Sequence, residues 1–105
     1  MSRKSRRPTP PGIMLRDMYL KPRRITVTAF AAAVGCSRKH MSDIINDRAR
    51  LDAVLAARIA RVLGTSTVLW LNLQAGLDAF DGEQAIKRWK PSVTFGADGK
   101  KALVK

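Results

Sequence analysis

The sequence predicts an all-α fold, a bundle of five short helices. Three observations predict it. Apolar residues recur at helical spacing in five segments, residues that favour helix starts and ends stand between those segments, and a glycine followed closely by a serine separates one pair of helices. At 105 residues the chain is long enough for one modest core and too short for two.

The first helix is expected to begin at the pair Pro10 and Pro11, because proline is tolerated in the first turn. Its apolar stripe consists of Met14, Leu15, Met18 and Tyr19. Pro22 is expected to end it, since proline cannot continue a helix.

Residues 26–46, TVTAFAAAVGCSRKHMSDIIN, predict two helices joined by a sharp turn. Thr26 caps the first helix, Gly35 can adopt positive φ at its end, and Ser37 caps the second. Ala31 lies four residues before Gly35, where the helices of a helix-turn-helix approach each other most closely. The side chains spaced to point inward are Phe30, Val34, Cys36, Met41, Ile44 and Ile45. The outer face of the second helix stays polar and mostly cationic, which indicates contact with DNA.

Asp52 is expected to cap a fourth helix that Gly64 ends, and Thr65 or Ser66 to cap a fifth that runs to about Phe80. The fifth helix is apolar around much of its circumference. Two interpretations stay open: it is the central core helix, or part of it contacts a second copy of the chain. The candidates for that dimer interface are Leu69, Trp70, Leu73 and Leu77.

Three regions follow: a flexible, disordered basic arm over residues 1–9, a helix-turn-helix DNA-binding and dimerisation domain over 10–82, and a C-terminal extension over 83–105. In the extension, SVTF and KALV flank GADGK, and Asp98 followed by Gly99 favours a hairpin turn. A two-stranded ribbon alone is marginally stable, so a short flexible tail is the preferred interpretation and a β-hairpin the alternative.

The formal net charge of +12 calls for a polyanionic partner, either nucleic acid or an acidic membrane surface. Cys36 is the only cysteine and His40 the only histidine, so no disulfide or two-thiol metal site can form within one chain, and no metal or cofactor is expected. No catalytic constellation or glycine-rich phosphate loop is present, which argues against an enzyme. The absence of a membrane-spanning stretch or signal peptide points to the cytoplasm.

The start of the second helix of the corner is the predicted reading surface, because recognition helices place their N-terminal residues against base edges. Arg38 and Lys39 are expected to bind guanine O6 and N7, and Asp43 to accept from cytosine N4. A phosphate contact is the alternative for Arg38, and an ion pair with Lys39 four residues away is the alternative for Asp43.

Phosphate contacts are expected from residues around the same corner and the loop after it: Thr26, Thr28, Ser37, Ser42, Asn46, Arg48 and Arg50. A second set, predicted to lie in an adjacent minor groove, belongs to the arm: Arg3, Lys4, Arg6 and Arg7. A solvated leader is the alternative for the arm.

From Pro10 to Phe80 the chain resembles the HigA (VapI-type) antitoxins, within the larger Xre and Cro group of helix-turn-helix proteins. The segments that carry the resemblance are PPGIMLRDMYLKP, ITVTAFAAAVGCSRKHMSDIIND, VLAARIARVLGTS and, most specifically, LWLNLQAGLD. The resemblance implies a lambda-repressor-like bundle and a dimer that represses its own operon at an inverted repeat of double-stranded DNA. It also implies neutralisation of a HigB-like toxin, a relative of RelE that cuts messenger RNA.

The chain departs from the family at two places. Pro10 to Ile13 stand where the family has His-Pro-Gly-Glu, and Val54 stands where an acidic residue is usual. Toxins of this class are commonly basic, so a net charge of +12 works against their long-range attraction. A stand-alone repressor without a toxin is therefore the second hypothesis. A module that only holds a protein partner is the third, and the Arg38 and Lys39 pair argues against it.

Overall fold

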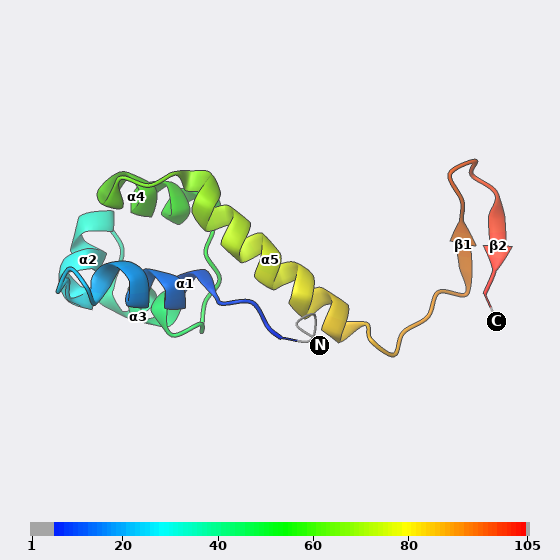
Figure 1. The fold of residues 1–105 in the computed structure, drawn as a ribbon, viewed down its shortest axis with the longest axis horizontal. Helices are drawn as coiled ribbons and strands as arrows, with labels where there is room; N and C mark the ends of the chain where they lie inside the picture. Colours follow the sequence, from blue (N-terminus) through cyan, green and yellow to red (C-terminus); the bar gives the residue numbers. More distant parts are fainter. Residues whose placement is uncertain (1–5, 105) are drawn as a thin grey trace.

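The computed structural model describes residues 6–104 and confirms the predicted fold class (Figure 1). In chain order the elements are α1 (Pro11–Met14), the π-helical segment η2 (Leu15–Leu20), α2 (Val27–Val34), α3 (Arg38–Ile45), α4 (Ala53–Leu63), α5 (Thr67–Ala85), β1 (Val93–Phe95) and β2 (Lys101–Leu103). α1 and η2 form one continuous first helix, so the helical part consists of the five expected helices with a small two-stranded sheet after them.

The helix boundaries follow the capping residues of the sequence. A side-chain oxygen accepts a hydrogen bond from the backbone N–H three residues further on at four helix starts: Thr26, Ser37, Asp52 and Ser66. Of the two candidates for the last cap, the structure selects Ser66. Gly35 and Gly64 end α2 and α4 in the left-handed conformation, with φ of 77° and 74°. That conformation favours glycine because it has no Cβ.

The first helix differs from the prediction in its second half. From Leu15 the helix widens, and the N–H of Lys21 donates to the carbonyl of Arg16, five residues back, at 2.9 Å. In an α-helix residues five apart lie about 140° apart around the axis. The wider turn brings Leu15 and Leu20 to the same side, and both are buried. The predicted stripe is therefore wrong at Met18, which is 64% exposed.

The core lies between the first helix, α2, α3, α4 and the first turns of α5. Its largest fully buried side chains are Trp70, Phe30, Leu15, Met41 and Ile59. Ala31 is buried at the corner between α2 and α3, as expected, whereas Cys36 is only half-buried. Gly12 lies where α1 passes close to α3, because a Cβ there would overlap the backbone carbonyl of Ile44.

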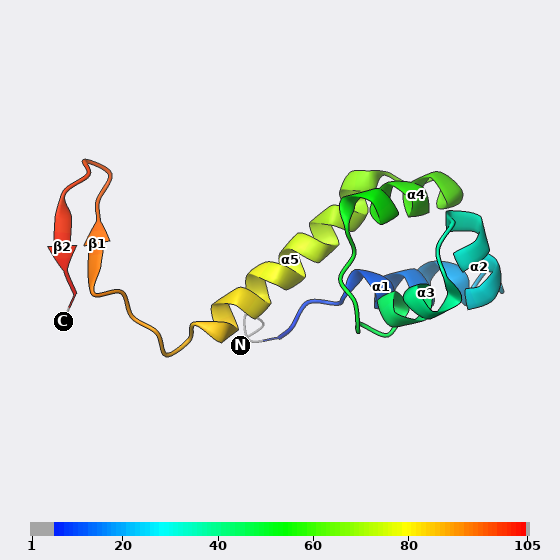
Figure 2. The ribbon, with the colours of Figure 1, turned by 180° about the vertical axis from the view of Figure 1, so that it is seen from behind.

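α5 continues to Ala85, five residues beyond the end expected at Phe80. The apolar pattern does stop there, but residues 81–85 are exposed and keep the helical hydrogen bonding without burial. The helix runs out of the bundle, and the sheet lies beyond its far end in both views (Figures 1 and 2). The molecule is accordingly elongated, with extents of 55 × 30 × 24 Å.

The C-terminal extension contains the hairpin that the sequence offered as the alternative to a flexible tail. β1 and β2 are antiparallel, with Val93 opposite Leu103 and Phe95 opposite Lys101. Gly99 has a φ of 80°, which favours glycine in the turn. The side chain of Asp98 accepts from the N–H of Lys100 at 2.9 Å, so the turn is held by its own residues.

None of the helices within residues 6–104 combines the length and apolar character required to cross a membrane. No three side chains of His, Cys, Asp or Glu in that part come together as metal ligands would.

Candidate nucleic-acid interface

The start of α3 presents two exposed cations next to the start of α2. Gly35 reverses the chain and Ser37 caps α3, so Arg38 and Lys39 are the first two residues of the helix. The side chain of Lys39 is 86% exposed. Arg38 Nε donates to Thr28 Oγ1 at 3.1 Å, which brings a predicted base-reading residue and a predicted phosphate contact together on one surface.

Asp43 lies one turn further along α3 and is held by two cations. Its carboxylate is 3.0 Å from Lys39 Nζ and 3.1 Å from Arg48 Nε. Hydrogen bonds from Lys39 and then Arg48 lower the pKa of Asp43, so its charged form is favoured. The ion pair with Lys39, which was the alternative interpretation, is thus present in the free protein, and base reading by Asp43 stays a prediction.

The hydroxyl and amide groups proposed for phosphate contacts surround the same corner. The oxygens of Thr26 and Ser37 accept from the backbone as caps, and each hydroxyl keeps its own O–H to donate. Asn46 ends α3, and its Nδ2 donates to the carbonyl of Ser42 at 2.8 Å. Both Ser42 and Asn46 are therefore fixed by local hydrogen bonds.

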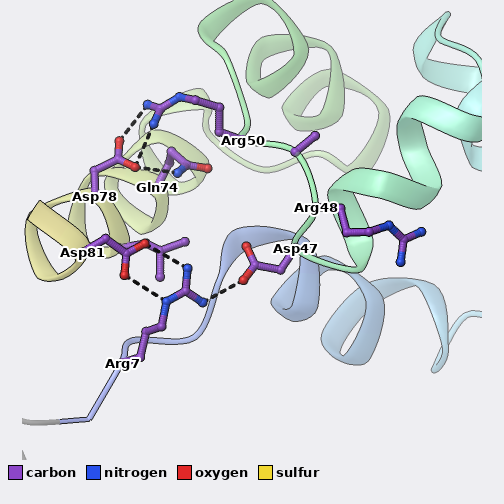
Figure 3. Close-up of a pocket in the computed structure, with 9 residues that line it drawn as sticks. Arg7, Asp47, Arg48, Arg50, Gln74, Asp78 and Asp81 are labelled. Carbon is purple, nitrogen blue, oxygen red and sulfur yellow. Dashed lines mark hydrogen bonds and ion pairs between the residues drawn. The ribbon is translucent and has the colours of Figure 1, made fainter. Parts of the chain in front are cut away.

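Arg50 faces α5. Its guanidinium forms two hydrogen bonds with Asp78, at 2.9 and 2.7 Å (Figure 3). Hydrogen bonds from Arg50 and Gln74 lower the pKa of Asp78, with the Arg50 bond the larger cause. A phosphate contact from Arg50 has to compete with this bidentate pair, which is stronger than a single bond between neutral groups.

Arg7 of the basic arm is held against the body of the protein. Its Nε and Nη2 donate to the two oxygens of Asp81 on α5, at 3.0 and 2.9 Å. Its Nη1 donates to Asp47, in the loop after α3, at 2.7 Å (Figure 3). Arg6 is exposed. Arg3 and Lys4, the other two residues predicted for the minor groove, lie outside the described residues.

The pocket of about 240 Å³ between this loop and α5 gathers charges of both signs. Three arginines and three aspartates line it, together with Ala49, Gln74 and Leu77: Arg7, Arg48, Arg50, Asp47, Asp78 and Asp81. Arg50 joins the loop directly to Asp78 on α5, and Arg7 bridges Asp47 of the loop and Asp81 of α5. Arg48 instead pairs with Asp43 on α3.

Two residues that the sequence analysis did not single out also position this surface. Arg58 on α4 donates through Nη1 to the carbonyl oxygens of Val34 and Gly35, at 3.4 and 3.3 Å, and so caps the end of α2. Gln74 is a buried polar side chain on α5. A polar residue within an apolar helix is a signal that the sequence offered, whereas nothing near Arg58 indicates its partners 23 and 24 residues away.

The four side chains predicted for the dimer interface divide into two groups. Trp70 and Leu77 are buried within the single chain, and Trp70 Nε1 donates to Thr65 Oγ1 at 2.7 Å. Leu69 and Leu73 are only partly buried and keep exposed surface. Leu69 and Leu73 also pack against the core of their own chain, so only part of their surface is left for a second copy.

Comparisons with known proteins agree with this arrangement. Residues 18–70 match the family HTH_3, described as helix-turn-helix. The antitoxin HigA-1 of Vibrio cholerae is 38% identical over 81 residues, 77% of this chain and 76% of that protein. The uncharacterised HTH-type transcriptional regulator YbaQ of Escherichia coli is 33% identical over 87 residues, 83% of this chain and 77% of that protein.

A solved structure extends the likeness to three dimensions. It contains the Pseudomonas aeruginosa antitoxin HigA with the higBA promoter, and it superposes with a TM-score of 0.75 at 32% identity. The match covers 78% of this chain and 89% of that one. The chain therefore belongs to the helix-turn-helix family and, within it, to the HigA antitoxins that its sequence resembles.

Proposed function

We propose that this protein is a sequence-specific DNA-binding antitoxin of a type II toxin-antitoxin module. It acts in the cytoplasm without catalysis, represses its own operon as a dimer and neutralises a RelE-like toxin that cuts messenger RNA. The observation that carries the proposal is the pair of exposed cations at the start of α3, held at a corner that Gly35 and Ser37 fix. The relative from Pseudomonas aeruginosa with its promoter supports it.

In this proposal α3 enters the major groove with its N-terminal end toward the bases. Arg38 and Lys39 bond guanine O6 and N7, each such pair contributing about 1–3 kcal/mol of discrimination. The hydrogen bond between Arg38 and Thr28 restricts the guanidinium before DNA arrives, which reduces the ordering that binding requires. Thr28 and the other hydroxyl and amide groups of the corner then face the phosphates.

The test replaces the two cations and measures sequence discrimination. Arg38→Ala combined with Lys39→Ala should abolish the preference for the operator over a scrambled duplex, because both base contacts are lost. The matched control, Arg61→Ala with Lys100→Ala, removes the same charge from exposed sites on α4 and the hairpin turn. An unchanged preference in the first variant would contradict the proposal.

The dimer is proposed to form through the partly exposed apolar side chains of α5. Leu69 and Leu73 keep exposed surface, and the neighbouring Val68 is 61% exposed. A two-fold pair with recognition helices about 34 Å apart would bind an inverted repeat whose half-sites lie one turn apart. Leu69→Glu should yield a monomer in sedimentation at micromolar concentration and weaken operator binding; a wild-type monomer there would refute the dimer.

A stand-alone repressor is the second candidate, and the net charge of +12 favours it because a basic toxin would be repelled at long range. If the chain does neutralise a basic toxin, the complex depends on apolar and local polar contacts, since charge steering governs the association rate more than the final affinity. Coexpression with the neighbouring gene decides between them. Copurification of a small basic protein supports the antitoxin, and absence of such a gene supports the repressor.

A further inference from the structure

The N-terminal segment of the described chain lies beside the C-terminal part of α5. The pair of hydrogen bonds between Arg7 and Asp81 fixes the N-terminal segment beside the last turns of α5, 74 residues away in sequence. Figure 1 shows this segment approaching α5 where the helix ends. The basic N-terminal segment is therefore held beside the helix whose end is followed in the chain by Lys87, Arg88 and Lys90.

Four exposed cations belong to these two segments: Arg6, next to Arg7, and Lys87, Arg88 and Lys90, directly after α5. Within residues 6–104 none of them forms an ion pair with a carboxylate, in contrast to Arg7 and Arg50. The backbone that carries three of them is not fully extended, because Lys87 N–H donates to Gln84 and Trp89 N–H donates to Ile86. We call these four residues the basic end.

The end of α5, which Lys87, Arg88 and Lys90 follow in the chain, lies toward the same side of the fold as α3 (Figures 1 and 2). In both views α4 occupies the upper side, α1 and α3 the lower side, and α5 descends from α4 to that lower side (Figures 1 and 2). A duplex that lies along α3 and continues past its half-site can therefore meet the end of α5. Clustered cations without protein partners suit phosphates, which bind point charges without reading sequence.

We propose that the basic end binds the phosphate backbone of operator DNA that flanks the half-site read by α3. This contact rests on the proposed DNA-binding function and adds to it a surface that contributes affinity and salt dependence but no base discrimination. It gives the C-terminal extension a role in DNA binding separate from that of the recognition helix.

The experiment compares two triple variants that both lower the net charge from +12 to +9. The first combines Lys87→Ala, Arg88→Ala and Lys90→Ala. The control combines Arg61→Ala, Lys100→Ala and Lys101→Ala, three exposed cations away from the basic end. The operator sequence is first identified by selecting duplexes that bind the wild-type protein. Each variant is then titrated at several salt concentrations on two duplexes of that sequence, one trimmed to the half-sites and one with about ten further base pairs on each side.

On the long duplex the first triple should flatten the dependence of log K on log salt by about 0.9 for each lost phosphate contact. On the trimmed duplex it should match the wild type, and the control should match the wild type on both apart from a small uniform loss. Equal effects of the two triple variants, or equal losses of affinity on both duplexes, would overturn the proposal. It would also be overturned if the basic end bound an acidic protein partner and did not bind DNA.

The same titrations separate this inference from the proposed function. The ratio of operator to scrambled affinity reports on α3, and the first triple should leave it unchanged. A wild-type protein with no operator preference would refute the proposed function, whatever the salt slopes show. Preserved preference with an unaltered slope would refute the basic end alone.

Discussion

The side chain of Gln74 accepts a hydrogen bond from the backbone N–H of Leu51 at 2.9 Å, and the bond is buried. Gln74 Nε2 also donates to Asp78 at 2.9 Å, and Asp78 in turn holds Arg50. Leu51 ends the loop that follows α3, so this chain of bonds joins α5 to the segment directly after the recognition helix. A helix proposed to dimerise is thus linked to the proposed reading surface.

Gln74→Leu should destabilise the protein by about 1–3 kcal/mol, because the N–H of Leu51 would stay buried without a partner. Unfolding in urea measures the change in the free energy of unfolding. Gln84→Leu, at an exposed position of the same helix, serves as the control and should change stability by less than about 0.5 kcal/mol. Equal effects at the two positions would show that the buried hydrogen bond contributes nothing particular.

Gly12→Ala should destabilise by about 1–3 kcal/mol or more, because the added methyl would overlap the carbonyl of Ile44 and push α1 away from α3. Gly76→Ala is the matched control on α5, where a Cβ meets nothing within 4 Å. It should stabilise by up to about 1 kcal/mol, since alanine favours a helix more than glycine does. Thermal unfolding of the two variants should therefore shift in opposite directions.

The hydrogen bonds of Arg7 to Asp81 should make the free energy of unfolding depend on pH. Hydrogen bonding to Arg7 lowers the pKa of Asp81 below its ordinary value of 3.8, so the folded state binds this proton less readily than the unfolded state. The stabilisation is fully present above about pH 4 and is lost as the pH falls through the lower folded pKa. Between pH 5 and pH 2, Asp81→Asn should lose less stability than the wild type, and identical pH profiles would contradict this.

Asp43→Asn should free Lys39 and Arg48 from their shared carboxylate and remove a negative charge from the proposed DNA surface. Non-specific affinity should rise, with a steeper salt dependence, because two cations become available to phosphates. Operator preference should fall by about 1–3 kcal/mol if Asp43 also accepts from cytosine. Asp17→Asn, which removes another paired carboxylate on η2, is the comparison, and an equal rise in both variants would point to net charge alone.

The local features of the fold were predictable because their causes lie within a few residues. Each cap joins a side chain to a backbone N–H three residues further on, and Gly35 and Gly64 end their helices by adopting a positive φ themselves. The same holds for the exposed Arg38 and Lys39, which follow directly from the cap at Ser37. The π-helical turn was missed because only contact with the core shows that Leu20, rather than Met18, faces inward.

The sequence by itself determined the helices, the ends that caps and left-handed glycines mark, and the cationic start of α3, since short-range hydrogen bonds and apolar spacing set these. Tertiary structure decided which charges find partners far away in the chain, whereas the pair of Lys39 and Asp43 follows from their local spacing. The bonds from Arg7 to Asp81 and from Arg50 to Asp78 span 74 and 28 residues. Such pairs depend on how α5 packs against the loop after α3. No local sequence pattern encodes a contact between residues so far apart in the chain.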